Sequence, residues 1–290
     1  MGIKPPLDYS QCNDFLTCQE KYNKRYNKCI RKIKEDRIDL SFGKLGHKCL
    51  ELYYKDRKEG KFNERDIEKY LLPFDSLVEI PNNKVKTQVA GKLAIRKYIE
   101  TYHLQEKDWE ILAVEETYEA EVKGIRYAFK VDLVIEHRGN LYCLDHKLSA
   151  KKDRKKFFNG YDLNSQMTGY CYAVMDKFGY CSGFYVNALF VGHRERKYKG
   201  EPAGYYCNPE RQLFTRYPES FTAFEENVRN IDRKIKDCVR DGIWTRNESN
   251  CDWCEFKMLC MAFDDEEIQE QFYQTCNPYE YLESVTGSCQ

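Results

Sequence analysis

The stretch that decides the fold of this chain runs over residues 127–147 and reads Tyr127-Ala-Phe-Lys-Val-Asp132-Leu-Val-Ile-Glu-His-Arg-Gly-Asn-Leu-Tyr-Cys-Leu-Asp145-His-Lys147. Apolar and more polar residues alternate through its first half, which is the period of a β-strand with two different faces. The residues Arg138-Gly-Asn140 supply a turn, after which the chain returns as a second strand. The stretch therefore predicts a β-hairpin.

Two carboxylates and a lysine share one face of this hairpin, because Asp132 lies on the more polar face of the first strand and Asp145 and Lys147 share a face of the second. With Arg138-Gly139 as the turn residues, Asp132 faces Asp145; with Gly139-Asn140, it faces Lys147. Both registers keep the three residues together, since they differ by two positions. Opposed residues have Cβ atoms about 5 Å apart, which lets two carboxylates hold one divalent cation. A solvated hairpin with ordinary surface charges is the alternative that these residues alone leave open.

Composition limits the class of protein. The chain has 290 residues, of which 42% are hydrophobic, and this is enough to bury one large core. Its 47 basic and 47 acidic residues cancel, so any affinity for nucleic acid has to come from local basic patches. The first residues contain no apolar signal segment, and no apolar run is long enough to span a membrane. We therefore expect a cytoplasmic protein with no membrane partner.

One basic patch follows the hairpin directly. Its members are Lys151, Lys152, Arg154, Lys155 and Lys156. They come a few residues after Lys147, where a phosphate backbone would pass if the hairpin cleaves nucleic acid. A solvated loop explains the same run equally well.

The chain has 14 cysteines, and some of them form a second candidate metal-binding group. The segment Cys251-Asp-Trp-Cys254-Glu-Phe-Lys-Met-Leu-Cys260 brings three thiols together in sequence, enough to wrap one soft metal centre but without a fourth ligand. Candidates for the fourth are Cys12, Cys18, Cys29, Cys276 and Cys289. Zinc also accepts four thiolates, and buried cysteines can act as small hydrophobic residues, so the spacing leaves three interpretations open.

The remaining patterns predict an α/β fold with a mixed central sheet flanked by helices. Helices are expected at 9–38, 41–54, 84–105, 163–175 and 218–238, and further strands at 109–120 and 182–191. Gly43 and Gly46 are both expected to permit close approach of their helix to a neighbour, while His47 taken alone is more often structural than a ligand. Gln166 and Tyr170 lie four residues apart and hence on one helix face, where core packing is the alternative to a role in a site.

Taken together, these residues resemble the RecB-type branch of the PD-(D/E)XK nuclease superfamily, especially its iron–sulfur members. That group includes the nucleases of CRISPR adaptation, the AddB nuclease domain and phage-encoded homologues. The motifs occur in the family's order: Ser10, Phe15-x-x-Cys18, Lys21-Tyr22, Gly46-His47, Glu116, Asp132, Asp145-x-Lys147, Gln166-x-x-x-Tyr170 and Cys251-x-x-Cys254-x5-Cys260. One departure is His146, which stands where the superfamily usually has an apolar residue. The segment 55–78 and the tail beyond residue 263 have no counterpart.

The resemblance implies a domain organisation. A restriction-endonuclease-like nuclease core would span 41–245, preceded by a helical segment at 1–40 that supplies one cluster cysteine. A cluster-binding segment at 246–263 and an acidic tail at 264–290 would follow. The N- and C-terminal segments would be joined by a [4Fe–4S] cluster on four cysteines, namely Cys18, Cys251, Cys254 and Cys260.

The resemblance also assigns roles. Mn²⁺ or Mg²⁺ would be held by His47, Asp132, Asp145 and the backbone carbonyl of His146. Glu116 would hold a second ion or a water, Lys147 would orient the attacking water or offset charge on the phosphate, and Gln166 would position Lys147 or a phosphate while Tyr170 contacts the DNA strand.

The activity that the resemblance implies is metal-dependent hydrolysis of DNA by an exonuclease acting on single strands or ends. The resemblance places this activity in DNA recombination, repair, or phage- or CRISPR-related processing. A protein partner from recombination or CRISPR adaptation is expected. The location would be the cytoplasm, which for a phage-encoded protein is that of the host cell. The competing interpretation is a DNA-binding adaptor subunit that keeps the fold without catalysis.

Overall fold

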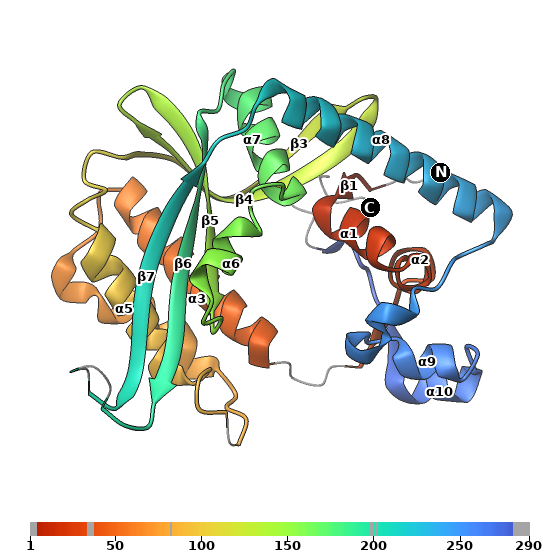
Figure 1. Ribbon diagram of the computed structural model, residues 1–290, viewed down its shortest axis with the longest axis horizontal. Coiled ribbons are helices and arrows are strands. Elements are labelled where there is room, and N and C mark those ends of the chain that lie inside the picture. The colour runs from red at the N-terminus through yellow and green to blue at the C-terminus, as the bar shows by residue number, and fades with distance from the viewer. Residues whose placement is uncertain (1–4, 34–37, 82, 198–199, 201, 281–290) are drawn as a thin grey trace. The chain divides into compact units, whose positions relative to one another are not determined.

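The computed structural model describes residues 5–33, 38–81, 83–197, 200 and 202–280 (Figure 1). The chain forms two compact units. The central unit contains Asp36–Glu116 and Lys130–Tyr217, and the terminal unit contains Met1–Glu35, Thr117–Phe129 and Pro218–Gln290. Among the helices within the described ranges, none is long and apolar enough to cross a membrane.

A mixed sheet organises the central unit, as the sequence predicts. Its main strands are β3 (Glu110–Val122), β4 (Ile125–His137), β5 (Asn140–Ser149), β6 (Gly183–Arg194) and β7 (Gly204–Phe214). The order is β1-β4-β5-β6-β7, with β3 also paired to β4. Strands β4 and β5 are antiparallel, as are β6 and β7, whereas β5 and β6 are parallel. A parallel pair needs a crossover connection, and the helices between β5 and β6 supply it.

The predicted hairpin adopts the first of its two expected registers. His137 pairs with Asn140, so Arg138 and Gly139 are the turn residues, with φ angles of 53° and 73°. Two positive φ angles are the signature of a type I′ turn, whose twist matches that of antiparallel strands. The pairing runs back to Leu133 opposite Leu144. One step further along this register, Asp132 comes beside Asp145.

Helices of the central unit pack on both faces of the sheet (Figure 1). They are α3 (Ile38–Lys58), α4 (Glu68–Leu71), α5 (Gln88–Tyr102), α6 (Arg154–Asn159) and α7 (Ser165–Phe178), with 3₁₀ turns at Glu64–Asp66 and Leu72–Ser76. Leu133, Ile135 and Leu144 belong to the core that includes residues of α3 and α5. The alternate positions of β5 face α7, where Cys143 meets Cys171. Asp145 and Lys147 follow the parity of Cys143 and share its face.

The expected close approach at Gly46 is confirmed. A Cβ atom at this position would lie 2.5 Å from a methyl carbon of Leu148, so any larger residue would force the Leu148 side chain to move while glycine lets α3 pack closely on β5. For Gly43, one turn earlier, the expected close approach is wrong, because this residue faces open space. The glycine therefore sets the distance between the helix that carries His47 and the strand that carries Asp145.

In the terminal unit, the predicted single helix over 9–38 is wrong. The chain instead forms α1 (Tyr9–Thr17), α2 (Gln19–Tyr22), a π-helical turn at Asn23–Asn27 and the strand β2 (Ile30–Lys32). Cys18 breaks the helix with an extended backbone, φ −168° and ψ 118°. Strand β2 pairs with β8 (Tyr273–Thr275), a partner more than two hundred residues away that no local pattern announces.

The rest of the terminal unit is helical. It contains the two-residue strand β1 (Leu7–Asp8), which pairs with β4, then α8 (Pro218–Asp241), a 3₁₀ turn at Glu248–Trp253, α9 (Lys257–Met261) and α10 (Glu266–Phe272). Part of the expected acidic tail therefore has regular structure, while its last ten residues lie outside the described part of the chain.

Candidate metal centre

Three elements of the central unit bring a histidine and two carboxylates to one point. His47 comes from α3, Glu115 from β3 and Asp132 from β4. The His47 Nδ1 atom lies 3.3 Å from Asp132 Oδ2 and 3.4 Å from Glu115 Oε1. One ligand atom from each residue falls within 4.8 Å of the other two, a spacing that a single metal ion can bridge.

Strand β5 adds a carboxylate–ammonium pair. The Lys147 Nζ atom donates to Asp145 Oδ1 at 2.7 Å. The other carboxylate oxygen, Oδ2, is buried and has no hydrogen-bond partner among the described residues. A buried carboxylate oxygen without a partner is costly unless a cation meets it. Asp145 therefore presents one oxygen to Lys147 and leaves the other for a ligand.

The glutamate of this group is Glu115, whereas the sequence analysis selects Glu116. Glu116 points to an exposed position, 3.8 Å from Lys58. The reason is a break in the alternation of β3: Ala113 and Val114 are both buried, and Glu115 has a left-handed φ of 51°. An irregular residue of this kind shifts the following side chains to the other face. No feature of the sequence marks the break.

The charges in this group perturb each other. Burial raises the pKa of Asp132 to about 6, helped by the neighbouring charges of Asp145 and Glu115. Burial would lower the pKa of His47, but the carboxylates of Asp132 and Glu115 outweigh it and raise it to about 9. Burial also opposes the charge of Lys147, yet Asp145 and Asp132 raise its pKa above the ordinary value. The three carboxylates of the site thus outnumber its two cationic groups, His47 and Lys147. An excess of negative charge of this kind favours binding of a metal cation.

Gln166 and Tyr170 face the same group from α7. The Gln166 side-chain amide donates to the Tyr170 hydroxyl at 2.9 Å. Burial raises the pKa of Tyr170, and the charges of Asp132 and Asp145 add to the effect, so the phenol lies within their electrostatic reach. The predicted face of this helix is therefore turned toward the carboxylates.

The side chain of His146 points to the opposite face of the sheet. Its ring stacks on Tyr54 at 5.6 Å, and its Nδ1 atom lies 3.1 Å from the amide nitrogen of Asn187. Burial lowers its pKa well below the usual value, so the ring is neutral. Its backbone N–H donates to Asp132 Oδ2 at 2.9 Å and fixes that carboxylate. The residue that departs from the superfamily pattern is thus a core residue, and its main chain is what touches the site.

The five members of the basic patch are exposed, and α6 begins within the patch at Arg154. Arg154 forms an ion pair with Glu210, and the Lys151 ammonium lies 5.9 Å from the centre of the Phe157 ring. The patch follows directly on the strand that carries Lys147. It therefore offers positive charge on long side chains a few residues beyond Lys147.

The four cysteines of the expected cluster all lie in the terminal unit. The backbone N–H of Asn247 donates to Cys18 Sγ at 3.4 Å, and the Asn247 carbonyl accepts from Cys251 Sγ at 3.9 Å. Cys254 and Cys260 pack on the same small hydrophobic group as Phe256. Among the described cysteines, no three of these four sulfurs lie within 4.8 Å of one another. One residue, Asn247, thus joins the first cysteine to the distant cysteine segment.

Comparison with known proteins agrees with this geometry. The sequence profile of the PD-(D/E)XK nuclease superfamily matches residues 6–261. A search of curated proteins finds no match.

One solved structure shares the fold. A crystal structure from Eubacterium rectale, described as a "putative exonuclease", aligns with a TM-score of 0.50 and 14% identity over 98% of this chain and 94% of that chain. A second, described as SSO0001, aligns with a TM-score of 0.33 and 9% identity over 87% of this chain and 92% of that one, and at this score it carries no argument. With a profile match over most of its length, the chain belongs to the PD-(D/E)XK nuclease superfamily.

Proposed function

We propose that this protein is a metal-dependent DNA exonuclease that hydrolyses phosphodiester bonds in single-stranded DNA or at DNA ends. The observation that carries the proposal is the buried, unpartnered Oδ2 of Asp145 beside a lysine and within one electrostatic group with Asp132 and His47 in the described part of the chain. An adaptor that only binds DNA has no need of a buried carboxylate oxygen that no described residue pairs with.

The residues present fit a divalent cation. His47, Asp132 and Asp145 would be its ligands, with the carbonyl of His146 alongside and with Glu115 as a further carboxylate. Oxygen donors with one imidazole suit Mn²⁺ and also accept Mg²⁺. When bound, such an ion supplies Lewis-acid polarisation of a phosphate and lowers the pKa of a water molecule.

Lys147 would act on the phosphate that is cleaved. Its ammonium stays charged because Asp145 and Asp132 hold its pKa high, and its side chain is 31% exposed, so the charge is accessible to a substrate. A fixed cation next to a phosphate stabilises the negative charge that develops as the bond to the attacking oxygen forms. The pairing with Asp145 Oδ1 orients the ammonium before substrate arrives.

Gln166 and Tyr170 would complete the first contacts with the strand. The hydrogen bond between them fixes the phenol. The amide oxygen of Gln166 could accept from the Lys147 ammonium, and the second N–H of its amide nitrogen could donate to a phosphate. The exposed basic patch that begins at Lys151 would hold the backbone through charge, which positions the strand without selecting its sequence. The proposed action at DNA ends is supported by the structural neighbour from Eubacterium rectale, which is described as a "putative exonuclease".

The four cysteines of the terminal unit would hold a [4Fe–4S] cluster. The contact of Asn247 with Cys18 and Cys251 supports Cys18 as the fourth ligand.

The test is cleavage of end-labelled single- and double-stranded DNA by anaerobically purified protein with Mn²⁺ or Mg²⁺, compared with Lys147→Ala prepared in the same way. We expect the variant to lose at least about 100-fold in cleavage rate while its DNA binding is kept. The product ladder then gives the polarity. Equal traces of cleavage by both proteins, with DNA binding intact, would assign the chain to the adaptor class instead.

A further inference from the structure

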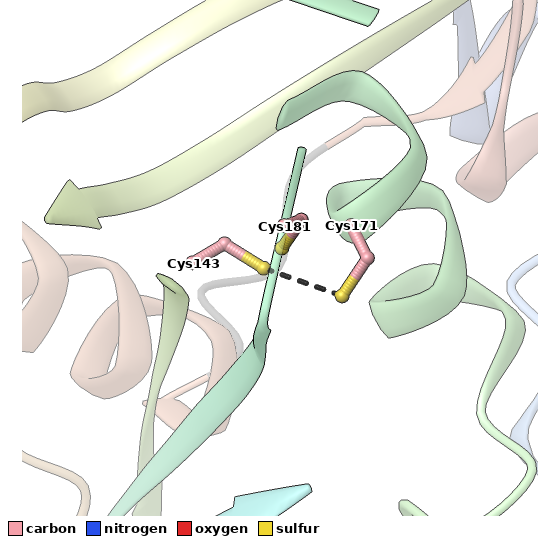
Figure 2. A group of neighbouring side chains, drawn as sticks. All are labelled: Cys143, Cys171 and Cys181. Atoms are coloured by element: carbon pink, nitrogen blue, oxygen red, sulfur yellow. Dashed lines mark hydrogen bonds between the residues drawn. The ribbon is translucent and has the colours of Figure 1, made fainter. Parts of the chain in front are cut away.

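Three cysteines that belong to neither proposed centre meet inside the central unit. Cys143 lies in β5, Cys171 in α7, and Cys181 just before β6. Their sulfur atoms all fall within 4.8 Å of one another, and the Cys143 and Cys171 sulfurs are 3.8 Å apart. Figure 2 shows these two sulfurs pointing toward each other, with the sulfur of Cys181 beside that of Cys143.

The distance between the sulfurs is compatible with a shared metal ion. A disulfide would hold two sulfurs about 2.05 Å apart, so Cys143 and Cys171 are both free thiols. Two thiolates on one tetrahedral zinc ion would lie about 3.8 Å apart. The separation of 3.8 Å therefore matches a pair of ligands around a single ion.

The surroundings are those of an enclosed site with one accessible side. Cys143 and Cys171 are 0% and 1% exposed, whereas Cys181 is half-buried. The carbonyl oxygen of Gly183 accepts from Cys181 Sγ at 3.3 Å and from Cys143 Sγ at 3.9 Å. The approach along Cys181 is thus the side from which an ion and its water could enter.

One cation lies near the sulfurs. Arg216 donates to the Thr168 hydroxyl and to the Tyr161 carbonyl, both at 2.8 Å, and its guanidinium lies within the electrostatic reach of Cys171 and Cys143. An ion of charge +2 with three thiolates carries a net charge of −1, which Arg216 offsets.

We propose that Cys143, Cys171 and Cys181 bind one Zn²⁺ ion through three thiolates, with water as the fourth ligand on the side of Cys181. Thiolates are soft ligands that select zinc over Mg²⁺ and Mn²⁺, so the site does not compete with the carboxylate centre for its ion. Binding displaces the thiol protons.

The ion would brace the elements that carry the nuclease residues. Cys143 precedes Asp145 by two positions on the same face of β5, and Cys171 follows Tyr170 directly in α7. A bond from each sulfur to one ion ties strand to helix at the point where both present functional side chains. Zinc bound here would therefore stabilise the central unit whether or not the protein cleaves DNA.

The test compares wild type with Cys181→Ser, a change at a half-buried loop position that the fold should tolerate, and with Cys207→Ser as the control. Cys207 is a buried cysteine of the same unit, on β7, outside the three-cysteine group. Each protein is purified anaerobically with a phosphine reductant, loaded with Zn²⁺ and gel-filtered. Zinc and iron per chain are then measured, together with the thermal midpoint with and without added zinc.

We expect Cys181→Ser to hold one zinc ion fewer per chain than wild type and to lose the zinc-dependent rise of the thermal midpoint. Cys207→Ser should match wild type in both measurements. Any zinc on the carboxylate centre or on the four terminal cysteines is common to all three proteins and cancels in the difference. Iron per chain should be equal in all three, so a failed iron–sulfur assignment shows separately.

Two results would overturn the proposal. Equal zinc in wild type and Cys181→Ser would remove the site, and so would equal loss of zinc in both serine variants. Loading with Cd²⁺ provides a direct check, because three thiolates on cadmium give a charge-transfer absorption in the ultraviolet. Both Cys181→Ser and a second variant, Cys171→Ala, should lack this absorption.

Discussion

The backbone N–H of His146 donates a 2.9 Å hydrogen bond to the Asp132 carboxylate, which in turn lies 3.3 Å from His47. This one contact ties β4 to β5 between the two residues, Asp145 and Lys147, that project toward α7. It fixes the direction of the Asp132 oxygens and leaves the His146 ring in the core. The site is therefore oriented by main chain on one side and by a helix on the other.

The choice between the two neighbouring glutamates can be tested directly. Glu115→Gln should weaken Mn²⁺ binding by about tenfold or more, because a neutral amide replaces a carboxylate that lies 3.4 Å from His47. Glu116→Gln, at an exposed position, should bind Mn²⁺ like wild type. Calorimetric titration of each variant with Mn²⁺ gives the two affinities. The reverse ranking would return the role to Glu116.

Mn²⁺ binding should tighten as the pH rises from about 6 to about 9. The pKa of His47 is about 9 and that of Asp132 about 6, so protons compete with the metal for both groups below these values. Each proton displaced by the metal strengthens binding by up to about tenfold per pH unit, and the effect ends where the group is already deprotonated. Titrations across this range should give the slope, and His47→Gln should reduce it. A pH-independent affinity would contradict the ligand set.

Gly46→Ala should destabilise the protein by about 1–3 kcal/mol, because its new methyl group would meet Leu148 at 2.5 Å. Gly43→Ala is the matched control in the same helix: it faces open space, and alanine there should raise stability by up to about 1 kcal/mol. Urea unfolding measures both.

Shortening the Leu148 side chain tests whether the clash with the new methyl group causes the loss of stability. In Leu148→Ala protein, the added Gly46→Ala change should cost far less than in wild type. An equal cost in both backgrounds would show that the clash is not the cause.

Cys254→Ala should give colourless protein that is sensitive to protease. A cluster that joins Cys18 to Cys251 closes a loop of more than two hundred residues, and closing such a loop removes about 5 kcal/mol of unfolded-chain entropy. Iron content and limited proteolysis are the measurements. Cys276→Ala, at a cysteine outside the proposed ligand set, should keep its colour. A brown and fully resistant Cys254→Ala protein would contradict the assignment.

Replacing the four lysines of the basic patch by glutamine should weaken binding to single-stranded DNA at every sequence alike. These are Lys151, Lys152, Lys155 and Lys156; Arg154 is left in place because it pairs with Glu210. The slope of log affinity against log salt should fall by about 0.7 for each phosphate that the variant no longer neutralises. Lys107→Gln, an exposed lysine on another loop, is the control. An unchanged slope would show that the strand runs elsewhere.

Much of the central unit could be predicted from local patterns. Alternation predicted the hairpin, and the turn residues reduced its register to two choices that both keep Asp132, Asp145 and Lys147 on one face. Helical spacing placed Gln166 and Tyr170 together on one face of α7. Strand β7 was missed, because Pro209 lies within it and proline is tolerated only in a strand at the edge of a sheet, such as this one.

The sequence by itself determined the fold class and the hairpin, because these depend on periodicity between neighbouring residues. Only the tertiary structure decided the register, the selection of Glu115 over Glu116, the end of the first helix at Cys18, and the meeting of Cys143, Cys171 and Cys181. Each of these depends on a backbone irregularity or on residues brought together from separate elements. Local patterns carry no information about such contacts, since packing energy between distant segments is what selects them.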